Sequence, residues 1–256
     1  MIDDLKPTTR FSGRVAHYAR NRPGYPQDII TCLKQHHHLQ PFHKVADFGS
    51  GTGLLSRLFL DYGNTVIGIE PNARMREAGE NYLSKYDEFI SMEGRAEDCG
   101  LVNEEIDFIV NGQAFHWFAV EETRCEFQRV LKPDGWVALI WNRRLIDNSD
   151  FSIAYEAFLH ENAIDYARIS KRQTDYGNID TFFSPCQYVE YSFPNWQIFD
   201  FEGLKGRVLS SSYAPRQTDH NWEQTLQQLQ DMFTQYQKNG LVQFDYLTVM
   251  MVGHLD

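Results

Sequence analysis

Three glycines spaced two residues apart are the part of this chain whose residue types say most about chemistry. Gly49, Gly51 and Gly53 follow an apolar run, and an amphipathic pattern begins directly after them. A backbone without Cβ atoms can turn sharply at this point and let a bulky ligand rest on the peptide plane. Glu70 ends the next apolar run, 23 residues after Asp47, where a carboxylate can accept hydrogen bonds from ribose hydroxyls. The pattern is therefore typical of a nucleoside-binding α/β half-fold.

The residues around the glycines disfavour a dinucleotide. The pattern G-x-G-x-x-G, begun at Gly49, requires a third glycine at position 54, and that residue is Leu54. Asp47 adds a negative charge near the place of a pyrophosphate, which repels phosphate and suits a ligand with a cationic amine and a sulfonium. These residues favour S-adenosylmethionine as the cofactor over NAD or a flavin.

A parallel sheet is needed to bring these residues together. Short apolar runs alternate with helical patterns between residues 44 and 142, which implies right-handed βαβ units. The expected strands are Lys44–Phe48, Thr65–Ile69, Glu88–Met92, Ile106–Val110 and Gly135–Trp141. The expected helices are Gly53–Tyr62, Asn72–Tyr86 and Glu121–Leu131.

The alternation ends after Trp141. The chain from 143 to about 190 looks mainly helical and predicts a cap over the sheet. Beyond it we expect a strand, a turn-rich segment, a helix and a closing strand, in the order Gln197–Phe201, Gly203–Pro215, Gln217–Lys238 and Leu241–Val252. The predicted fold is an α/β, Rossmann-like, mostly parallel seven-stranded sheet with an antiparallel last strand, helices on both faces and a helical cap.

The expected organisation has four parts. Residues 1–40 form a lid over the cofactor site, and 41–142 form the cofactor-binding core. Residues 143–195 form the helical cap and the substrate region, and 196–256 complete the sheet. Because ligands of open α/β sheets bind at the carboxyl ends of the strands, we expect the loops at 49–53, 70–72, 94–98 and 111–117 to line one site.

At these loops the chain resembles the class I S-adenosylmethionine-dependent methyltransferases with a type 11 domain. Within them it is similar to the small-molecule branch of trans-aconitate methyltransferase. The motifs that carry the resemblance are the runs at 45–53, 66–72, 94–98 and 129–136. The resemblance covers residues 10–142 well and the final strands loosely, and it implies a class I methyltransferase fold.

The resemblance also implies roles for individual residues. The backbone of the glycine loop, Ser50 included, would pass beneath the methionyl part, with Asp47 near its ammonium group. Glu70 would accept from both ribose hydroxyls, because a carboxylate only accepts. The remaining residues implied to contact the cofactor are Pro71, Asn72, Ala96, Glu97, Gly112, Gln113 and Ala114. Arg95 departs from the family pattern, in which an Asp is common.

The N-terminal run 11–26 also looks like this branch. In relatives such a segment lies over the cofactor, so Tyr18 and Arg22 could meet its carboxylate, and an arginine fork matches a carboxylate bidentately. The alternative is an aromatic helix packed on the core with an exposed arginine.

His116 is the candidate general base, since its side chain can take a proton near neutral pH. A packing role for His116 stays open, because methyl transfer to a carboxylate needs alignment and no base. Trp117, Arg143, Arg144 and Tyr213 are candidates for the substrate site. The two arginines could hold an acidic substrate or be solvated charges at a strand end.

Charge and composition narrow the partners. A net charge of −11 argues against a broad phosphate-binding surface, so no nucleic-acid partner is expected. Four scattered cysteines, an acidic start and no long apolar run predict a cytoplasmic protein without a membrane partner. No metal site is expected either. Neighbouring residues of the triplet 36–38 point about 100° apart on a helix, and we expect it to be a solvated helix end.

The sequence as a whole predicts an enzyme that moves a methyl group from S-adenosylmethionine to a small molecule. The acceptor is expected to be an oxygen, in a carboxylate or a hydroxyl. Two alternatives remain open: a methyltransferase acting on RNA or protein, and a non-catalytic S-adenosylmethionine-binding module.

Overall fold

The computed structural model describes residues 22–163, 166, 179–211 and 222–255. Its centre is one seven-stranded sheet with the strand order β3-β2-β1-β4-β5-β7-β6. The strands are β1 (Lys44–Phe48), β2 (Thr65–Ile69), β3 (Phe89–Met92), β4 (Ile106–Gly112), β5 (Leu131–Arg144), β6 (Tyr188–Phe199) and β7 (Val242–Gly253). β7 runs antiparallel to both of its neighbours, and the pairs among β1 to β5 are parallel. The predicted fold class is confirmed.

Helices cover both faces of this sheet. They are α3 (Asp28–His37), α4 (Leu54–Tyr62), α5 (Ala73–Tyr82), α6 (Val120–Val130), α7 (Asp150–Asn162), α9 (Ile179–Phe183), α10 (Phe201–Leu209) and α11 (Trp222–Tyr236), with the short 3-10 helix η2 (Phe115–Trp117). Among the described residues, none of the helices has the length and apolar character needed to span a membrane.

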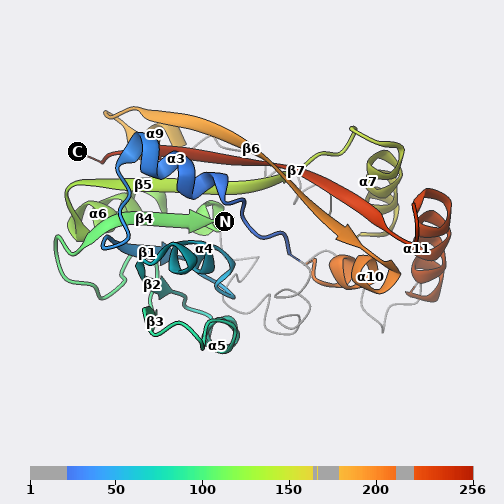
Figure 1. Ribbon diagram of the computed structural model, residues 1–256, viewed down its shortest axis with the longest axis horizontal. Coiled ribbons are helices and arrows are strands. Elements are labelled where there is room, and N and C mark those ends of the chain that lie inside the picture. Colours follow the sequence, from blue (N-terminus) through green and yellow to red (C-terminus); the bar gives the residue numbers. More distant parts are fainter. Residues whose placement is uncertain (1–21, 164–165, 167–178, 212–221, 256) are drawn as a thin grey trace.

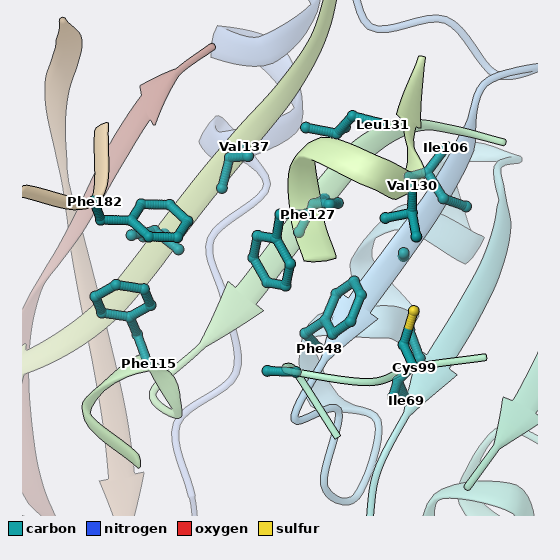
Figure 2. Packing of buried hydrophobic residues seen from close by; sticks show 14 of the residues in the cluster. Phe48, Ile69, Cys99, Ile106, Phe115, Phe127, Val130, Leu131, Val137 and Phe182 are labelled. Atoms are coloured by element: carbon teal, nitrogen blue, oxygen red, sulfur yellow. The ribbon is translucent and has the colours of Figure 1, made fainter. Parts of the chain in front are cut away.

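The two faces have separate apolar clusters because successive side chains of a strand point to opposite sides. On one face Val45 and Phe108 pack against α3 and α4. On the other, Phe48 packs against Phe127 of α6, with ring centroids 4.4 Å apart, and Phe182 of α9 joins the same cluster. Figure 2 shows Phe48, Phe127 and Phe182 in this cluster, where neighbouring rings are tilted or edge-to-face. The central strands β1, β2 and β4 are thus buried on both faces, as their apolar runs predicted.

A third apolar cluster surrounds the end of β6 and the start of β7. Phe199 and Phe244 pack there against α7, α10 and α11. Figure 1 shows these three helices gathered at one end of the molecule, away from α3 to α6. The described helices of the predicted cap at 143–195 belong to two different cores. α9 packs against α6 in the main core, whereas α7 packs with α10 and α11.

Several elements differ from their predicted bounds. β5 begins at Leu131 instead of Gly135, and it contains an irregularity near Pro133: Ile106 pairs with Leu131, whereas Phe108 pairs with Trp136. β6 begins at Tyr188 instead of Gln197. The alternation of its polar and apolar residues was missed because Pro194 interrupts it, and β6 is the edge strand, where proline is tolerated.

The prediction of a turn-rich segment over Gly203–Pro215 was also wrong in its first part, because residues 201–209 form helix α10; residues 212–215 lie outside the described residues. The Asp200 side chain accepts a hydrogen bond from the backbone N–H of Gly203 at 2.8 Å and caps the helix. Gly203 is required by packing, since a Cβ there would lie 2.8 Å from the Phe199 ring.

The histidine triplet was only partly assigned correctly. His36 and His38 are exposed, but His37 is buried, with its Nε2 3.1 Å from the Tyr191 hydroxyl and its ring against Trp136. Burial lowers the pKa of His37 to about 4. This residue fixes α3 on the sheet.

Candidate functional site

The glycine loop turns back over the tip of β2. Gly49, Gly51 and Gly53 all have left-handed backbone angles, with φ of 69°, 56° and 79°. The N–H groups of Gly49 and Ser50 donate to the Ile69 carbonyl at 2.8 and 3.2 Å. The loop is thereby tied to the end of β2, and its bare backbone is available at the carboxyl edge of the sheet.

Glu70 holds the same loop from the side. Its carboxylate accepts from the Gly51 N–H at 3.0 Å and from the Asn72 N–H at 2.8 Å. The Asn72 side chain in turn caps α5 by accepting from the N–H groups of Arg74 and Met75. Glu70 is 9% exposed, and burial raises its pKa. The contact between the β1 loop and Glu70 agrees with the sequence prediction that these loops lie together. Pro71, between Glu70 and Asn72 in the sequence, is half-buried.

Asp47 lies beneath the loop and is 1% exposed. One carboxylate oxygen accepts from the Ser56 hydroxyl of α4 at 2.6 Å. Among the residues that the structure describes, the other oxygen, Oδ1, has no hydrogen-bond partner. Burial raises the pKa of Asp47 to about 7, and the negative charge of Glu70 adds to the rise. A buried carboxylate with an unbonded oxygen suits a neighbouring cation.

The β3 tip is joined to α6 through Glu97. This carboxylate accepts from the Ala119 N–H at 3.0 Å, and it pairs with Arg95 at 3.2 Å. Ala96 is buried in the main core between these two residues. Arg95, which departs from the family pattern, is thus engaged with Glu97, and both Glu97 oxygens have partners in the protein.

The β4 tip packs directly against the glycine loop. A Cβ placed on Gly49 would lie 2.7 Å from the Ala114 Cβ. Gln113 has a left-handed φ of 64°, and its N–H donates to the Ile140 carbonyl at 3.0 Å. A non-glycine residue in this conformation is strained, and such strain is found most often at functional sites. Ala114 of this tip therefore lies beside the β1 loop, and the contact of Gly112, Gln113 and Ala114 with a cofactor stays a prediction.

The aromatic and histidine candidates follow in η2. His116 and Trp117 are half-buried, with ring centroids 4.8 Å apart. The preceding Phe115 is anchored by the Asn111 amide, whose oxygen accepts from the Phe115 N–H at 2.9 Å. This anchoring sets where η2 begins after the β4 tip.

The two arginines at the end of β5 have different surroundings. Arg143 is exposed. The Arg144 side chain is 11% exposed and forms an ion pair with Glu156, and its Nη2 also donates to the Tyr166 hydroxyl at 3.1 Å. Its guanidinium lies over the Tyr155 ring, 4.9 Å from the centroid. Within the described part of the chain, Nη1 of Arg144 is buried with no hydrogen-bond partner.

The remaining candidates lie near or outside the described residues. Arg22 donates from Nη2 to the Ser210 carbonyl at 3.2 Å, at the end of α10. Tyr18 and Tyr213 lie outside the described residues, so their roles stay predictions.

Comparisons with known proteins agree with this arrangement. Residues 46–139 match a family model described as a methyltransferase domain. An uncharacterized methyltransferase of Schizosaccharomyces pombe is 34% identical over 140 residues, which are 54% of this chain and 54% of that protein. The chain spans about half the length of the curated relatives it matches.

Solved structures share the fold over most of the chain. A putative type II methyltransferase from Anaeromyxobacter dehalogenans has a TM-score of 0.68 at 17% identity, covering 91% of this chain and 97% of that one. Residues 46–139 of this chain are a methyltransferase domain, and the chain has the fold of class I methyltransferases. A phosphoethanolamine N-methyltransferase from Haemonchus contortus, solved with S-adenosylhomocysteine, has a TM-score of 0.56 at 13% identity, covering 100% and 60%.

The candidate site has supporting residues that sequence reasoning missed. Ser56 bonds Asp47, and the Asn111 amide donates to the Phe48 carbonyl at 2.5 Å, joining β1 to β4. Tyr25 places its hydroxyl where a Cβ on Gly112 would lie. A polar residue at the end of an apolar strand was a usable signal for Asn111, but the other two contacts depend on the tertiary fold.

A hollow lies at the amino ends of β4 and β5, opposite the glycine loop. It is lined by residues 103–104, 128–129, 131–135, 186–187 and 254–255. Two of its cations are already engaged, Arg129 with Glu126 and Lys132 with Asp107. The glycine loop, Glu70 and the β4 tip all lie at the carboxyl edge, so the candidate site is there.

The buried charge of Asp47 predicts a pH-dependent stability of the methyltransferase domain. An unfolded Asp has a pKa near 3.8, and in the folded chain the pKa is about 7. Between these values the folded state binds more protons, so its stability falls as pH rises from about 4 to about 7. We expect the isosteric Asp47→Asn variant, without ligand, to have a Tm several degrees above that of the wild type at pH 8. Calorimetry at pH 8 and pH 4.5 measures this.

The control for this prediction is the pH itself. At pH 4.5 both the wild-type carboxyl and the amide are uncharged in the fold, so the gain should largely disappear. An equal gain at both pH values would contradict the assignment of the effect to the charge of Asp47. A Tm lower than that of the wild type at pH 8 would contradict the predicted sign.

Proposed function

We propose that this protein transfers a methyl group from S-adenosylmethionine to a small-molecule acceptor, and that the acceptor atom is an oxygen. The observation that carries the proposal is the contact between the glycine loop and the buried Glu70 carboxylate at 3.0 Å. This contact joins the tips of β1 and β2, the two places where a nucleoside ligand of such a sheet binds. The conformation of Gln113 at the neighbouring β4 tip supports the same site.

The residues present fit S-adenosylmethionine on two counts. The glycine loop makes its turn at the carboxyl edge of the sheet with three left-handed residues, and the 2.7 Å approach of a Cβ on Gly49 to Ala114 indicates that it packs closely on the β4 tip. The unbonded oxygen of the buried Asp47 suits the positive charge of an ammonium and a sulfonium and disfavours a pyrophosphate. When bound, this cofactor supplies an electrophilic methyl group on a positively charged sulfur.

The residues of the chain would act on this methyl group by binding and alignment. Glu70 would hold the ribose, and the backbone of the glycine loop would support the methionyl part. Ala96 and Glu97 would border the adenine, with Glu97 held in place by Ala119. Gln113, fixed by the Ile140 carbonyl, would border the path between acceptor and sulfur. Alignment of this kind contributes up to about 7–11 kcal/mol, which suffices for an acceptor that needs no base.

The acceptor side of the proposal rests on Arg144. Its side chain is enclosed, and its Nη1 is a donor that finds no partner among the described residues. An oxygen of the acceptor would satisfy it. Glu156 and Tyr166 hold the guanidinium on the other side. Arg143 is exposed and serves as the matched control.

A methyl-transfer assay against a panel of carboxylic acids and phenols tests the proposal. With an active acceptor, Arg144→Gln is expected to raise the KM for that acceptor about tenfold or more, because one buried hydrogen bond to a charged donor is lost. The KM for S-adenosylmethionine should not change, and Arg143→Gln should leave both values unchanged. Arg144→Lys keeps the charge and tests whether the guanidinium itself is needed.

Other outcomes separate the alternatives. Turnover only with RNA or protein would overturn the small-molecule acceptor. Binding of S-adenosylhomocysteine without turnover across the whole panel would favour a non-catalytic module. A net charge of −11 supports the small-molecule acceptor over RNA. The cytoplasmic location predicted above belongs to the same proposal.

A further inference from the structure

A polar cluster separates two apolar cores on one face of the sheet. On β5 and β7, Ile140 and Met250 belong to the core beneath α3 and α4, and Phe244 belongs to the core of α7, α10 and α11. Between them the paired residues Asn142 and Thr248 are polar. We call Asn142, Thr248 and Asn195 of β6 the Asn142 cluster. It lies at the carboxyl end of β5, next to the β4 tip.

Each polar atom of the Asn142 side chain has a defined partner. Its Oδ1 accepts from the Thr248 hydroxyl at 2.5 Å and from the Asn195 amide at 3.1 Å. Its Nδ2 donates to the Gly24 carbonyl at 3.0 Å. The Asn195 amide donates to the same carbonyl at 2.9 Å. Two donors on one side and a carbonyl on the other fix the orientation of the amide.

The backbone of Asn142 is joined to the candidate site. Its carbonyl accepts from the Gln113 side chain at 3.1 Å, and the Gln113 N–H donates to Ile140 at 3.0 Å. Gln113 holds its left-handed conformation between these two bonds. One residue of β5 is therefore bonded both to the β4 tip and to the chain at Gly24, 118 positions earlier.

The chain at Gly24 also touches the β4 tip directly. The hydroxyl of Tyr25 occupies the space that a Cβ on Gly112 would need. Glycine at 112 thus lets the N-terminal segment lie against the tip. The Asn142 cluster holds that segment by the carbonyl just before Tyr25.

We propose that Asn142 is a positioning residue for methyl transfer, which holds the segment at Gly24 and Tyr25 against the β4 tip beside Gln113. This inference rests on the proposed function, because it assigns Gln113 to the path of the methyl group. Asn142 acts through Gln113 and Gly24 and has no direct part in the chemistry. Thr248, which is fully buried, sets the orientation of the Asn142 amide.

Thr248→Val tests the proposal with the smallest change in shape, since it replaces the hydroxyl by a methyl group, and Thr248→Ser is the rescue. Asn142→Ala removes the whole amide. Asn148→Ala is the matched control, because Asn148 also bonds to β7, through Asp245 at 2.8 Å, away from the cluster. Backbone amide exchange of 22–27 and 111–115 is compared in all four variants with that of 49–53.

With Asn142→Ala and Thr248→Val we expect faster exchange in both 22–27 and 111–115 and no change in 49–53. Thr248→Ser and Asn148→Ala should behave as the wild type. The Kd for S-adenosylhomocysteine should stay within about threefold, whereas kcat with any acid or phenol that the wild type methylates should fall about tenfold or more. A purely structural role predicts faster exchange throughout the sheet, an unchanged KM, and an apparent kcat reduced only in proportion to the folded fraction.

Two results would overturn the inference. One is unchanged exchange of either segment in Asn142→Ala. The other is loss of kcat in Thr248→Ser equal to that in Thr248→Val. If the wild type fails to bind S-adenosylhomocysteine, the proposed function fails, and the exchange data still decide whether Asn142 holds the two segments together.

Discussion

Replacing Glu70 with alanine is expected to weaken S-adenosylhomocysteine binding by about 10²-fold or more. The variant would lose the two hydrogen bonds from the ribose to the carboxylate, and bonds to a charged group contribute about 1.5–3 kcal/mol each. The Gly51 and Asn72 N–H groups, which donate to the carboxylate at 3.0 and 2.8 Å, would also lose their acceptor, so the loop would lose its support. Titration calorimetry at pH 8 measures the change in Kd.

The conservative variant separates charge from shape. Glu70→Gln keeps one acceptor oxygen and should bind with an affinity between those of the wild type and the alanine variant. Because the Gly51 and Asn72 N–H groups donate to different oxygens of Glu70, Glu70→Gln leaves one of these groups without its acceptor. Glu93→Gln is the matched control. Glu93 is exposed and pairs with Arg76, which also donates to the Glu70 carbonyl. Equal affinity in the wild type and Glu70→Ala would contradict the ribose assignment.

Gly49→Ala is expected to destabilise the fold and to remove cofactor binding together. A left-handed backbone costs a residue with a Cβ about 1–2 kcal/mol, and the added Cβ would lie 2.7 Å from Ala114. Relieving that overlap costs about 1–3 kcal/mol more and displaces the β1 loop from the β4 tip. Chemical denaturation and S-adenosylhomocysteine titration are the measurements.

Gly240 provides a control with the same backbone conformation. Its φ is 79°, and a Cβ there would meet nothing within 4 Å. Gly240→Ala should therefore show the strain alone, with binding unchanged. Ala114→Gly in the Gly49→Ala background should recover the part due to overlap, as a double-mutant cycle measures. If Gly49→Ala and Gly240→Ala lose equal stability and both bind S-adenosylhomocysteine, the packing of the β1 loop on the β4 tip is needed neither for stability nor for cofactor binding.

The first half of the fold could be predicted from the sequence because its signals are local. β1 and β2 have their predicted bounds, since parallel strands buried on both faces are short apolar runs that end at glycine or an acid. The helices after them begin at Leu54 and after Asn72, whose side chain caps the first turn. Each of these signals lies within a few residues of the element it starts.

The second half carries weaker local signals. β6 is an edge strand with mixed residue types, so neither a long apolar run nor a clean alternation marks it, and Pro194 reads as an interruption. In α10 the glycines at 203 and 206 suggest turns, although Gly203 is set by its contact with Phe199. In this half tertiary packing decides which residues form helices and strands. The residues that make these contacts are too far apart in the sequence to be recognised in a window of about ten residues.

The candidate site divides in the same way. The loops at the tips of β1, β2 and β4 were predicted to meet, and Gly51 contacts Glu70 while Ala114 faces Gly49. The burial of Asp47 by Ser56 and the bond from Asn142 to Gly24 join residues that no short pattern links. The roles of these residues toward the cofactor and the acceptor stay predictions.

The position of β7 in the sheet has a consequence for the order in which the strands can pair while the protein is being synthesised. β7 lies inside the sheet, between β5 and β6, and among the described strands β6 pairs with β7 alone. A nascent chain emerging from the ribosome therefore presents β6 without a partner until the last strand has been translated. The β1 to β5 half can assemble earlier, since its contacts lie closer along the chain. During that interval the edge of β5 and the whole of β6 are unpaired strand edges, which are the surfaces most prone to aggregation.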